Sequence, residues 1–300
     1  MKRLSIFLLA TLLILGPLTG CSKKTIEKRG EHKNSLTYSN LVDLESQDEV
    51  RKAMELAEIP KSTIDLFFKD VNYFNETIEE KDLVKEKFTS VDKLEPEYDF
   101  YGIQDIWDLN SPDFIGYNCR ITSFDLVKDL IQIEKINTEN SDWLIFDEQA
   151  IESSPRDLFN QEELEEFRSL YSHIATEDTK DISTHVNNIK KNWGDKGIKF
   201  PDTDKISLIS VFFHDEGGYL FIGHIGVLLP AEDGKLLFIE KLAFQAPYQA
   251  IKFDNRLDLN DYLMNKYDMS WGQPTAKPFI MENDQLLEGY RENPNNIEND

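Results

Sequence analysis

The chain has 300 residues and a formal net charge of −23, with 40% hydrophobic and 30% charged residues. This size and composition predict a folded protein with a sizeable core, arranged as one large domain or two small ones. The acidic balance excludes nucleic acid as an expected partner, because phosphate binding needs clustered Lys and Arg, and it argues against broad electrostatic adhesion to anionic lipid.

The N-terminus has the sequence pattern of an export signal. After Lys2 and Arg3, residues 4–18 are almost wholly apolar, which is too short for a membrane span and typical of a signal peptide. This stretch ends in Leu18-Thr19-Gly20-Cys21, which resembles the lipobox of bacterial lipoproteins. The resemblance implies cleavage before Cys21 and attachment of diacylglycerol and fatty-acyl chains such as palmitate to that residue. The alternative is an uncleaved anchor with an incidental cysteine.

The expected organisation follows from these signals and from composition. Acyl chains on Cys21 would anchor the protein at the extracytoplasmic face of the cell membrane, and the polar, Lys-rich stretch after it reads as a tether. The predicted parts are a lipoprotein signal peptide (1–20), a flexible tether (21–35), a single α+β domain (36–290) and a disordered tail (291–300).

The first half of the domain has mainly helical periodicity. The pattern predicts a helix that begins at an Asn40 cap and ends by Pro60, and a second helix after Ser62, while residues 77–87 fit either a helix or an exposed loop. Aromatic residues are dense over 98–109. They are expected to pack on the core: Tyr98, Phe100, Tyr101 and Trp107.

Two short patterns in this half concern chemistry. Ser90-Val91-Asp92-Lys93 matches the S-x-x-K pattern of penicillin-recognising serine enzymes, but the S-D-N and K-T-G signatures are absent downstream, so chance explains the match better. Asn118 is a plausible N-cap, which makes Cys119 the first residue of a helix. The partial positive charge of a helix N-terminus lowers a thiol pKa, and the unpaired Cys119 N–H is a candidate oxyanion donor. The alternative is that Cys119 is a small buried hydrophobe.

Beyond the helices predicted for residues 161–173 and 181–193, the period changes to that of strands. The predicted strands cover 206–213, 219–229, 235–243 and 248–253, joined by turns at 215–218 and 230–234 into an antiparallel meander. A further helix is expected after Asp254.

His224 lies within the second strand, in Gly223-His224-Ile225-Gly226-Val227. Glycine weakens a strand and often marks close approach by a backbone or ligand, so the functional interpretation is an imidazole that faces a cleft. A three-residue loop after Pro230 would place Glu240 opposite His224, where it could orient the ring. A slip of one residue would move Glu240 to the other face. The alternatives are a hydrogen-bonded core histidine and an acid that merely interrupts an apolar run.

The order of a helix-borne Cys, an H-x-G-hydrophobic strand and a strand with a polar residue resembles papain-like proteins, most closely the NlpC-type cell-wall peptidases and amidases. The resemblance implies an α+β fold with a papain-like core, in which the Cys-bearing helix packs on an antiparallel sheet, plus extra N-terminal and inserted helices. It implies Cys119 as nucleophile, His224 as base and Glu240 as the residue that orients it.

This resemblance covers residues 113–130 and 206–254. It departs beside the cysteine, where those peptidases usually have an acidic residue before it and Ser-Gly after it, whereas this chain has Asn118 and Arg120-Ile121. Asn118 and Arg120 are candidate substrate-binding residues, and a surface ion pair is the alternative for Arg120. Over its whole length the chain resembles an uncharacterised bacterial lipoprotein family, known as domain of unknown function 4300.

The leading functional hypothesis is a cysteine hydrolase, amidase or acyltransferase that acts on amide bonds, with a cell-wall peptide or protein as substrate. The alternatives are a non-catalytic papain-like lipoprotein for binding or scaffolding, and a solute-binding lipoprotein, which the absence of two repeated lobes disfavours. No cofactor and no metal are expected, because the chain has no H-E-x-x-H motif and no Cys pair with metal-ligand spacing.

Overall fold

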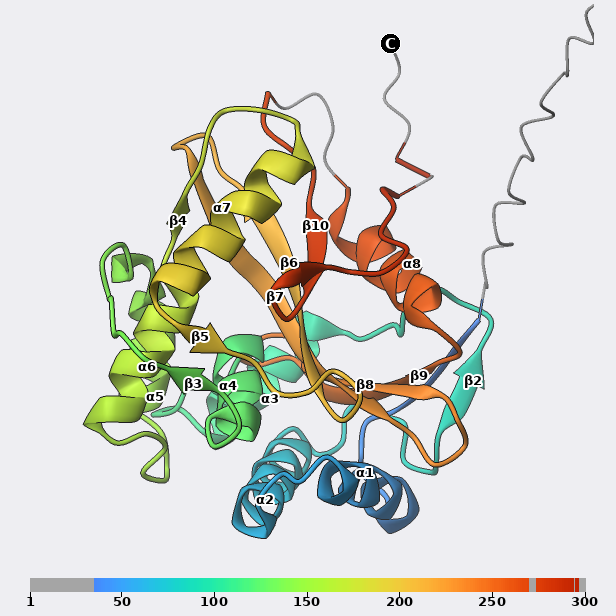
Figure 1. Cartoon of the computed structure of the whole chain (residues 1–300). Helices are drawn as coiled ribbons and strands as arrows, with labels where there is room; N and C mark the ends of the chain where they lie inside the picture. Colours follow the sequence, from blue (N-terminus) through green and yellow to red (C-terminus); the bar gives the residue numbers. More distant parts are fainter. Residues whose placement is uncertain (1–34, 270–273, 294, 297–300) are drawn as a thin grey trace, which may run out of the picture. The chain divides into compact units, whose positions relative to one another are not determined.

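A twisted antiparallel sheet runs through the domain and carries helices on its faces (Figure 1). The computed structural model describes residues 35–269, 274–293 and 295–296. The predicted signal peptide, the lipidation site at Cys21 and nearly all of the predicted tether therefore lie outside the described residues. Within the described part, the fold is mixed α+β.

The described helices are α1 (Leu44–Leu56), α2 (Lys61–Thr77), α3 (Phe100–Asn110), α4 (Cys119–Val127), α5 (Ile145–Glu152), α6 (Gln161–Tyr171), α7 (Ile182–Asp195) and α8 (Arg256–Tyr267), with a 3-10 turn η1 (Asp142–Leu144) before α5. The described strands are β1 (Leu36–Ser39), β2 (Thr89–Val91), β3 (Gln132–Ile133), β4 (Ile174–Ala175), β5 (Ile198–Lys199), β6 (Ser207–His214), β7 (Tyr219–Pro230), β8 (Leu236–Lys241), β9 (Tyr248–Phe253), β10 (Phe279–Glu282) and β11 (Gln285–Leu286).

The four strands predicted from the sequence form the centre of the sheet. β6, β7, β8 and β9 lie side by side in chain order, within the longer order β11-β10-β6-β7-β8-β9-β1-β2. Strands β1 and β10 were not predicted. All four residues of β10 are buried, so it lacks the alternation of polar and apolar residues that marks a half-exposed strand.

Alternate residues of the sheet face two separate parts of the core. Leu208 and Phe212 of β6 pack in the cluster that includes α1, α2, α4 and α7, whereas Ile209 and Val211 pack in the cluster that includes α8. This is the period-two alternation of a strand that is buried on both faces. Helices α7 and α8 accordingly flank the sheet on different sides (Figure 1).

Two expectations for the N-terminal half are wrong. Asn40 does not cap α1, because its side chain is buried and donates to the Tyr98 hydroxyl and the Tyr248 carbonyl, and Asp43 caps the helix instead. The aromatic residues over 98–109 are also not all in the core. Phe100 is 48% exposed and Tyr101 is 84% exposed, since both lie in the first turn of α3 on its outer side.

The loop between β7 and β8 is longer than expected. The last pair is Pro230 with Leu236, so residues 231–235 form the loop in place of the predicted three. The predicted pairing of Glu240 with His224 is therefore shifted by two residues. Because side chains alternate with a period of two, this shift keeps Glu240 on the expected face.

The described part of the predicted tail is held on the domain. The Asn293 backbone N–H donates to the Asp268 carboxylate at 2.9 Å, and the Asn296 side chain donates to it at 2.6 Å. Across residues 35–269, 274–293 and 295–296, no helix combines the length and apolar character needed to cross a bilayer.

Candidate functional site

Helix α4 begins where the sequence predicted, and a tight approach of two loops fixes its start. Asn118 is the N-cap and accepts a hydrogen bond from the Ile121 N–H at 3.0 Å, which leaves Cys119 as the first helical residue. Just before it, Gly116 has a φ of +92°, and a Cβ added there would lie 2.2 Å from the Phe244 carbonyl oxygen. Only glycine fits this position, so the loop after β8 lies directly against the start of α4.

The N-terminus of α4 reaches the sheet where two strands separate. The β7–β8 ladder stops at Val227 with Ile239, although β8 continues to pair with β9 as far as Lys241. Beyond that point α4 takes the place of β8 against the edge of β7. The Arg120 guanidinium donates to the Ile222 carbonyl at 3.1 Å, and the Ile225 N–H hydrogen-bonds the Cys119 sulfur. The thiol is therefore held against the strand that carries His224.

His224 connects the thiol to a buried carboxylate. Its Nε2 lies 2.5 Å from Oε2 of Glu240, which leaves Nδ1 as the ring nitrogen for the sulfur, and the imidazole interacts with Cys119 both electrostatically and by hydrogen bonding. The Tyr267 ring stacks on the imidazole at 5.0 Å between centroids. The Cys–His–Glu arrangement therefore has the connectivity of a nucleophile, a base and a residue that orients the base.

All three side chains are buried: Cys119 is 5% exposed, His224 is 1% exposed and Glu240 is fully covered. Burial by itself would raise the pKa of Cys119, but the positive charge and hydrogen bond of His224, the charge of Arg120 and the Ile225 N–H outweigh it, so that pKa lies below its ordinary value. This is the environment that favours a thiolate.

The pKa values of His224 and Glu240 shift in opposite directions, and both shifts favour the charged form. Burial opposes the charged imidazole, yet the charges of Cys119 and Glu240 raise the pKa of His224 to about 9. Burial likewise opposes the Glu240 carboxylate, while Lys266, His224 and the Tyr262 hydroxyl lower its pKa to about 2. All three pKa shifts therefore favour the thiolate, imidazolium and carboxylate forms over the neutral ones.

Asn118 and Arg120 share one partner that the sequence did not reveal. Asp147 of α5 accepts from the Asn118 amide at 2.7 Å and from Arg120 Nε and Nη2 at 2.9 and 2.7 Å. The Arg120–Asp147 pair is buried, with side chains 12% and 1% exposed, and the guanidinium lies 4.6 Å over the Trp143 ring. The predicted surface ion pair is thus a buried one, and it fixes both residues that flank Cys119. Their role in substrate binding stays a prediction.

The two glycines around His224 serve packing. A Cβ added to Gly223 would lie 2.4 Å from the Phe213 ring, and one added to Gly226 would lie 2.4 Å from the Phe238 ring. Aromatic side chains therefore fill the space that the sequence assigned to a cleft. Gly223 is also the extra residue of a β-bulge, because Val211 pairs with His224 while Phe212 pairs with Ile222. Bulges redirect neighbouring side chains, and this one immediately precedes the candidate base.

A buried polar network supports Glu240 from behind. Its Oε1 accepts from the Gln249 amide at 2.6 Å and from the Tyr262 hydroxyl at 2.5 Å. Gln249 in turn accepts from the Tyr98 hydroxyl at 3.0 Å, and Asn40 donates to that hydroxyl at 2.8 Å. These contacts were not predicted from the sequence. The available signal was Gln249 itself, a polar residue at a buried position of a predicted strand.

The S-x-x-K pattern forms no site. Ser90 lies on the short edge strand β2 and bonds Thr37 at 2.7 Å, while Lys93 pairs with Glu97 at 2.6 Å. Among the described residues, no group of three or more His, Cys, Asp or Glu side chains is placed to hold a metal ion.

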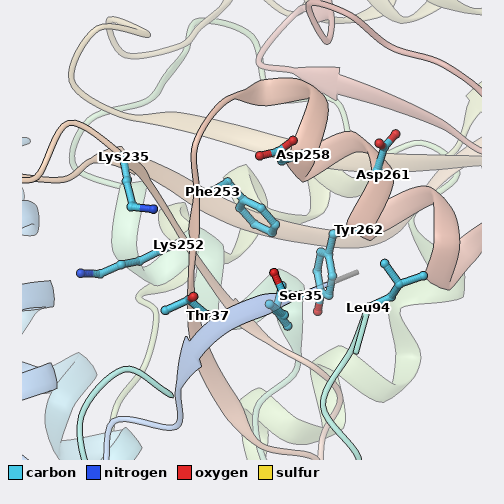
Figure 2. A pocket seen from close by; sticks show the side chains of 10 residues that line it. Ser35, Thr37, Leu94, Lys235, Lys252, Phe253, Asp258, Asp261 and Tyr262 are labelled. Carbon is cyan, nitrogen blue, oxygen red and sulfur yellow. The ribbon is translucent and has the colours of Figure 1, made fainter. Parts of the chain in front are cut away.

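A pocket on the α8 side of the sheet has charged walls (Figure 2). Lys235 and Lys252 line one side, and Asp258 and Asp261 line the other. Its volume is only about 60 Å³. Tyr262 also lines it, so that residue separates this pocket from Glu240.

Comparison with known proteins places the chain in a family. A family model described as "Domain of unknown function (DUF4300)" matches residues 37–287, which run from the second residue of β1 to just beyond β11. The chain belongs to the DUF4300 family. No curated protein and no solved structure matches this DUF4300 chain significantly.

Proposed function

We propose that this DUF4300 protein is a cysteine hydrolase or acyltransferase for amide bonds, built on a papain-like, NlpC-type core. One observation carries the proposal: Cys119 is the first residue of α4 and interacts with His224, whose Nε2 lies 2.5 Å from Glu240. The lowered pKa of Cys119 and the raised pKa of His224 support a reactive ion pair.

The first half-reaction is acyl transfer to sulfur. The Cys119 thiolate attacks the amide carbonyl carbon, a C–S bond forms, and the Cys119 N–H stabilises the developing oxyanion. The His224 imidazolium donates its Nδ1 proton to the amine nitrogen as the C–N bond breaks, and the amine leaves. Glu240 keeps the ring oriented and stabilises its positive charge.

The second half-reaction releases the acyl group. Neutral His224 takes a proton from water, or from an acceptor amine, as that nucleophile attacks the thioester carbonyl carbon. The C–S bond breaks, the thiolate returns and the proton on His224 restores the imidazolium. Water yields a carboxylic acid, and an amine yields a new amide.

The test is the alkylation of Cys119 by iodoacetamide as a function of pH. A Cys21→Ser background leaves Cys119 as the single thiol of the full chain, since the sequence holds two cysteines. A reactive Cys119 should be alkylated well below the ordinary thiol pKa of about 8.5. His224→Gln should slow the reaction at neutral pH by roughly tenfold or more.

A matched control comes from another buried histidine. His185 hydrogen-bonds Thr176 and the Thr179 carbonyl, so His185→Gln should leave the alkylation rate unchanged. Ordinary thiol reactivity of Cys119 that is insensitive to His224→Gln would contradict the proposed enzymatic activity. That outcome would favour a papain-like lipoprotein for binding or scaffolding, an alternative consistent with the 5% exposure of Cys119.

We further propose that acyl chains on Cys21 anchor the protein at the extracytoplasmic face of the membrane, with a cell-wall peptide or protein as substrate. Leu18-Thr19-Gly20-Cys21 after an apolar stretch supports this location. The test is metabolic labelling of the full chain with an alkynyl palmitate in a bacterial host. Label should disappear in Cys21→Ser and persist in Cys119→Ser, and label retained in Cys21→Ser would contradict the anchor.

A further inference from the structure

A hollow lies beside the candidate base, on the side of the Tyr267 ring. Its volume is about 380 Å³. Apolar side chains form much of its wall, including Phe100 of α3, Leu242 and Ala246 of the loop after β8, and Tyr267 at the end of α8. Because Tyr267 also stacks on His224, the hollow extends to the ring that covers the imidazole.

The wall from the loop after β8 is held in place by a buried lysine side chain. Lys241 donates to the carbonyl oxygens of Ala243 at 2.7 Å and Phe244 at 3.1 Å, and also to that of Ala246. The same loop meets Gly116 just before α4. Its position is therefore fixed with respect to both the hollow and Cys119.

A second lysine gives the hollow a charge preference. Lys266 lines the hollow and lies 5.6 Å from the centroid of the Tyr267 ring. No carboxylate among the described residues lies within ion-pair distance of Lys266, although its charge lowers the pKa of Glu240. An unpaired, half-buried ammonium on an apolar wall favours a ligand that carries a negative charge beside an apolar group.

We propose that this hollow binds the part of the substrate in which an apolar side chain lies next to a carboxylate. Phe100, Leu242 and Tyr267 contact the apolar group, and Lys266 binds the carboxylate. The inference rests on the proposed amide chemistry of Cys119, since it defines which amides reach the thiol. The substrate class is thus an acidic peptide with an adjacent apolar residue, such as a segment that ends in a free carboxyl group.

The experiment compares three alkylating reagents on the Cys21→Ser full chain. Iodoacetamide is small and neutral, N-phenyliodoacetamide adds an aromatic ring, and N-(p-carboxyphenyl)iodoacetamide adds a carboxylate to that ring. The carboxyphenyl reagent should alkylate Cys119 roughly tenfold faster than the phenyl reagent, the preference expected from one charge-assisted hydrogen bond. Lys266→Gln should abolish this preference, and each aryl rate is divided by the iodoacetamide rate of the same variant, because Lys266 also stabilises the charge of Glu240.

Two further variants separate a local effect from a general one. Lys235→Gln removes the same charge from the other pocket (Figure 2) and should keep the preference. Gln104 is an exposed residue of α3 that lines the hollow, so Gln104→Trp should narrow the hollow and slow both aryl reagents without slowing iodoacetamide.

The outcomes are distinct for the two proposals. A carboxylate preference that survives Lys266→Gln, or an equal loss in Lys235→Gln, would overturn the binding site. A preference that depends on Lys266, together with iodoacetamide reactivity that ignores His224→Gln, would uphold the site and reject the catalytic role of the pair.

Discussion

Replacing Glu240 with glutamine should lower the pKa of His224 and, through it, raise the pKa of Cys119. The substitution keeps the shape of the side chain and removes the charge whose Oε2 lies 2.5 Å from His224 Nε2. Burial disfavours the charged imidazolium, and less negative charge then remains to offset this effect on the pKa of His224. Because His224 is then less often charged, the Cys119 thiolate is stabilised less.

The size of the effect follows from the hydrogen bond. A bond to a charged group contributes roughly 1.5–3 kcal/mol, and one pKa unit corresponds to about 1.4 kcal/mol. In Glu240→Gln the pKa of His224 should therefore fall from about 9 by roughly one to two pH units. It does not fall further, because the Cys119 thiolate still interacts with the ring.

The assay is a pH titration of the ¹⁵N resonances of the His224 ring, accompanied by the ultraviolet absorbance of the thiolate. Glu282 provides a matched control, since it is a buried acid on β10 that pairs with Arg256 at 2.6 Å. Glu282→Gln should leave the titration of His224 unchanged. A titration of His224 that stays near its wild-type midpoint in Glu240→Gln would refute the role assigned to the carboxylate.

The pKa shifts of His224 and Glu240 also predict the pH range in which this pair stabilises the fold. The folded pKa of His224, about 9, lies above its ordinary 6.5, so its contribution is complete below pH 6.5 and is lost as pH rises through 9. The folded pKa of Glu240, about 2, lies below its ordinary 4.5, so its contribution is present above pH 4.5 and is lost as pH falls through 2. Urea unfolding should show the largest cost of Glu240→Gln between pH 4.5 and 6.5.

Two further predictions concern the scaffold around Cys119. Asp147→Asn removes the carboxylate paired with the buried Arg120 and should reduce the free energy of unfolding by about 3–5 kcal/mol. Asp142→Asn at an exposed site nearby should cost little, and equal costs in urea denaturation would contradict this. Gly226→Ala places a Cβ 2.4 Å from an aromatic ring and should cost about 1–3 kcal/mol. Gly194→Ala adds a Cβ that meets no atom within 4 Å in α7 and should instead stabilise the protein by up to about 1 kcal/mol. A drop in the melting temperature of Gly194→Ala would contradict the difference in packing between these two glycines.

Local chemistry made part of the fold predictable. The cap at Asn118, the start of α4 at Cys119 and the meander of β6 to β9 all follow from residues close in the sequence, because capping, helical periodicity and strand alternation are short-range effects. Asn40 shows the limit. Its side chain has the chemistry of an N-cap, but it is buried and donates to the Tyr98 hydroxyl and the Tyr248 carbonyl instead of capping a helix.

The sequence by itself predicted Cys119 as the candidate nucleophile and His224 as the candidate base, whereas the face of Glu240 depended on a loop length that the sequence did not fix. Only the tertiary structure decided what surrounds them. Asp147 joins Asn118 and Arg120 across 29 and 27 positions of sequence, and Tyr262 reaches Glu240 across 22. Contacts of this kind depend on how helices pack on the sheet, and residue spacing along the chain carries no record of that packing.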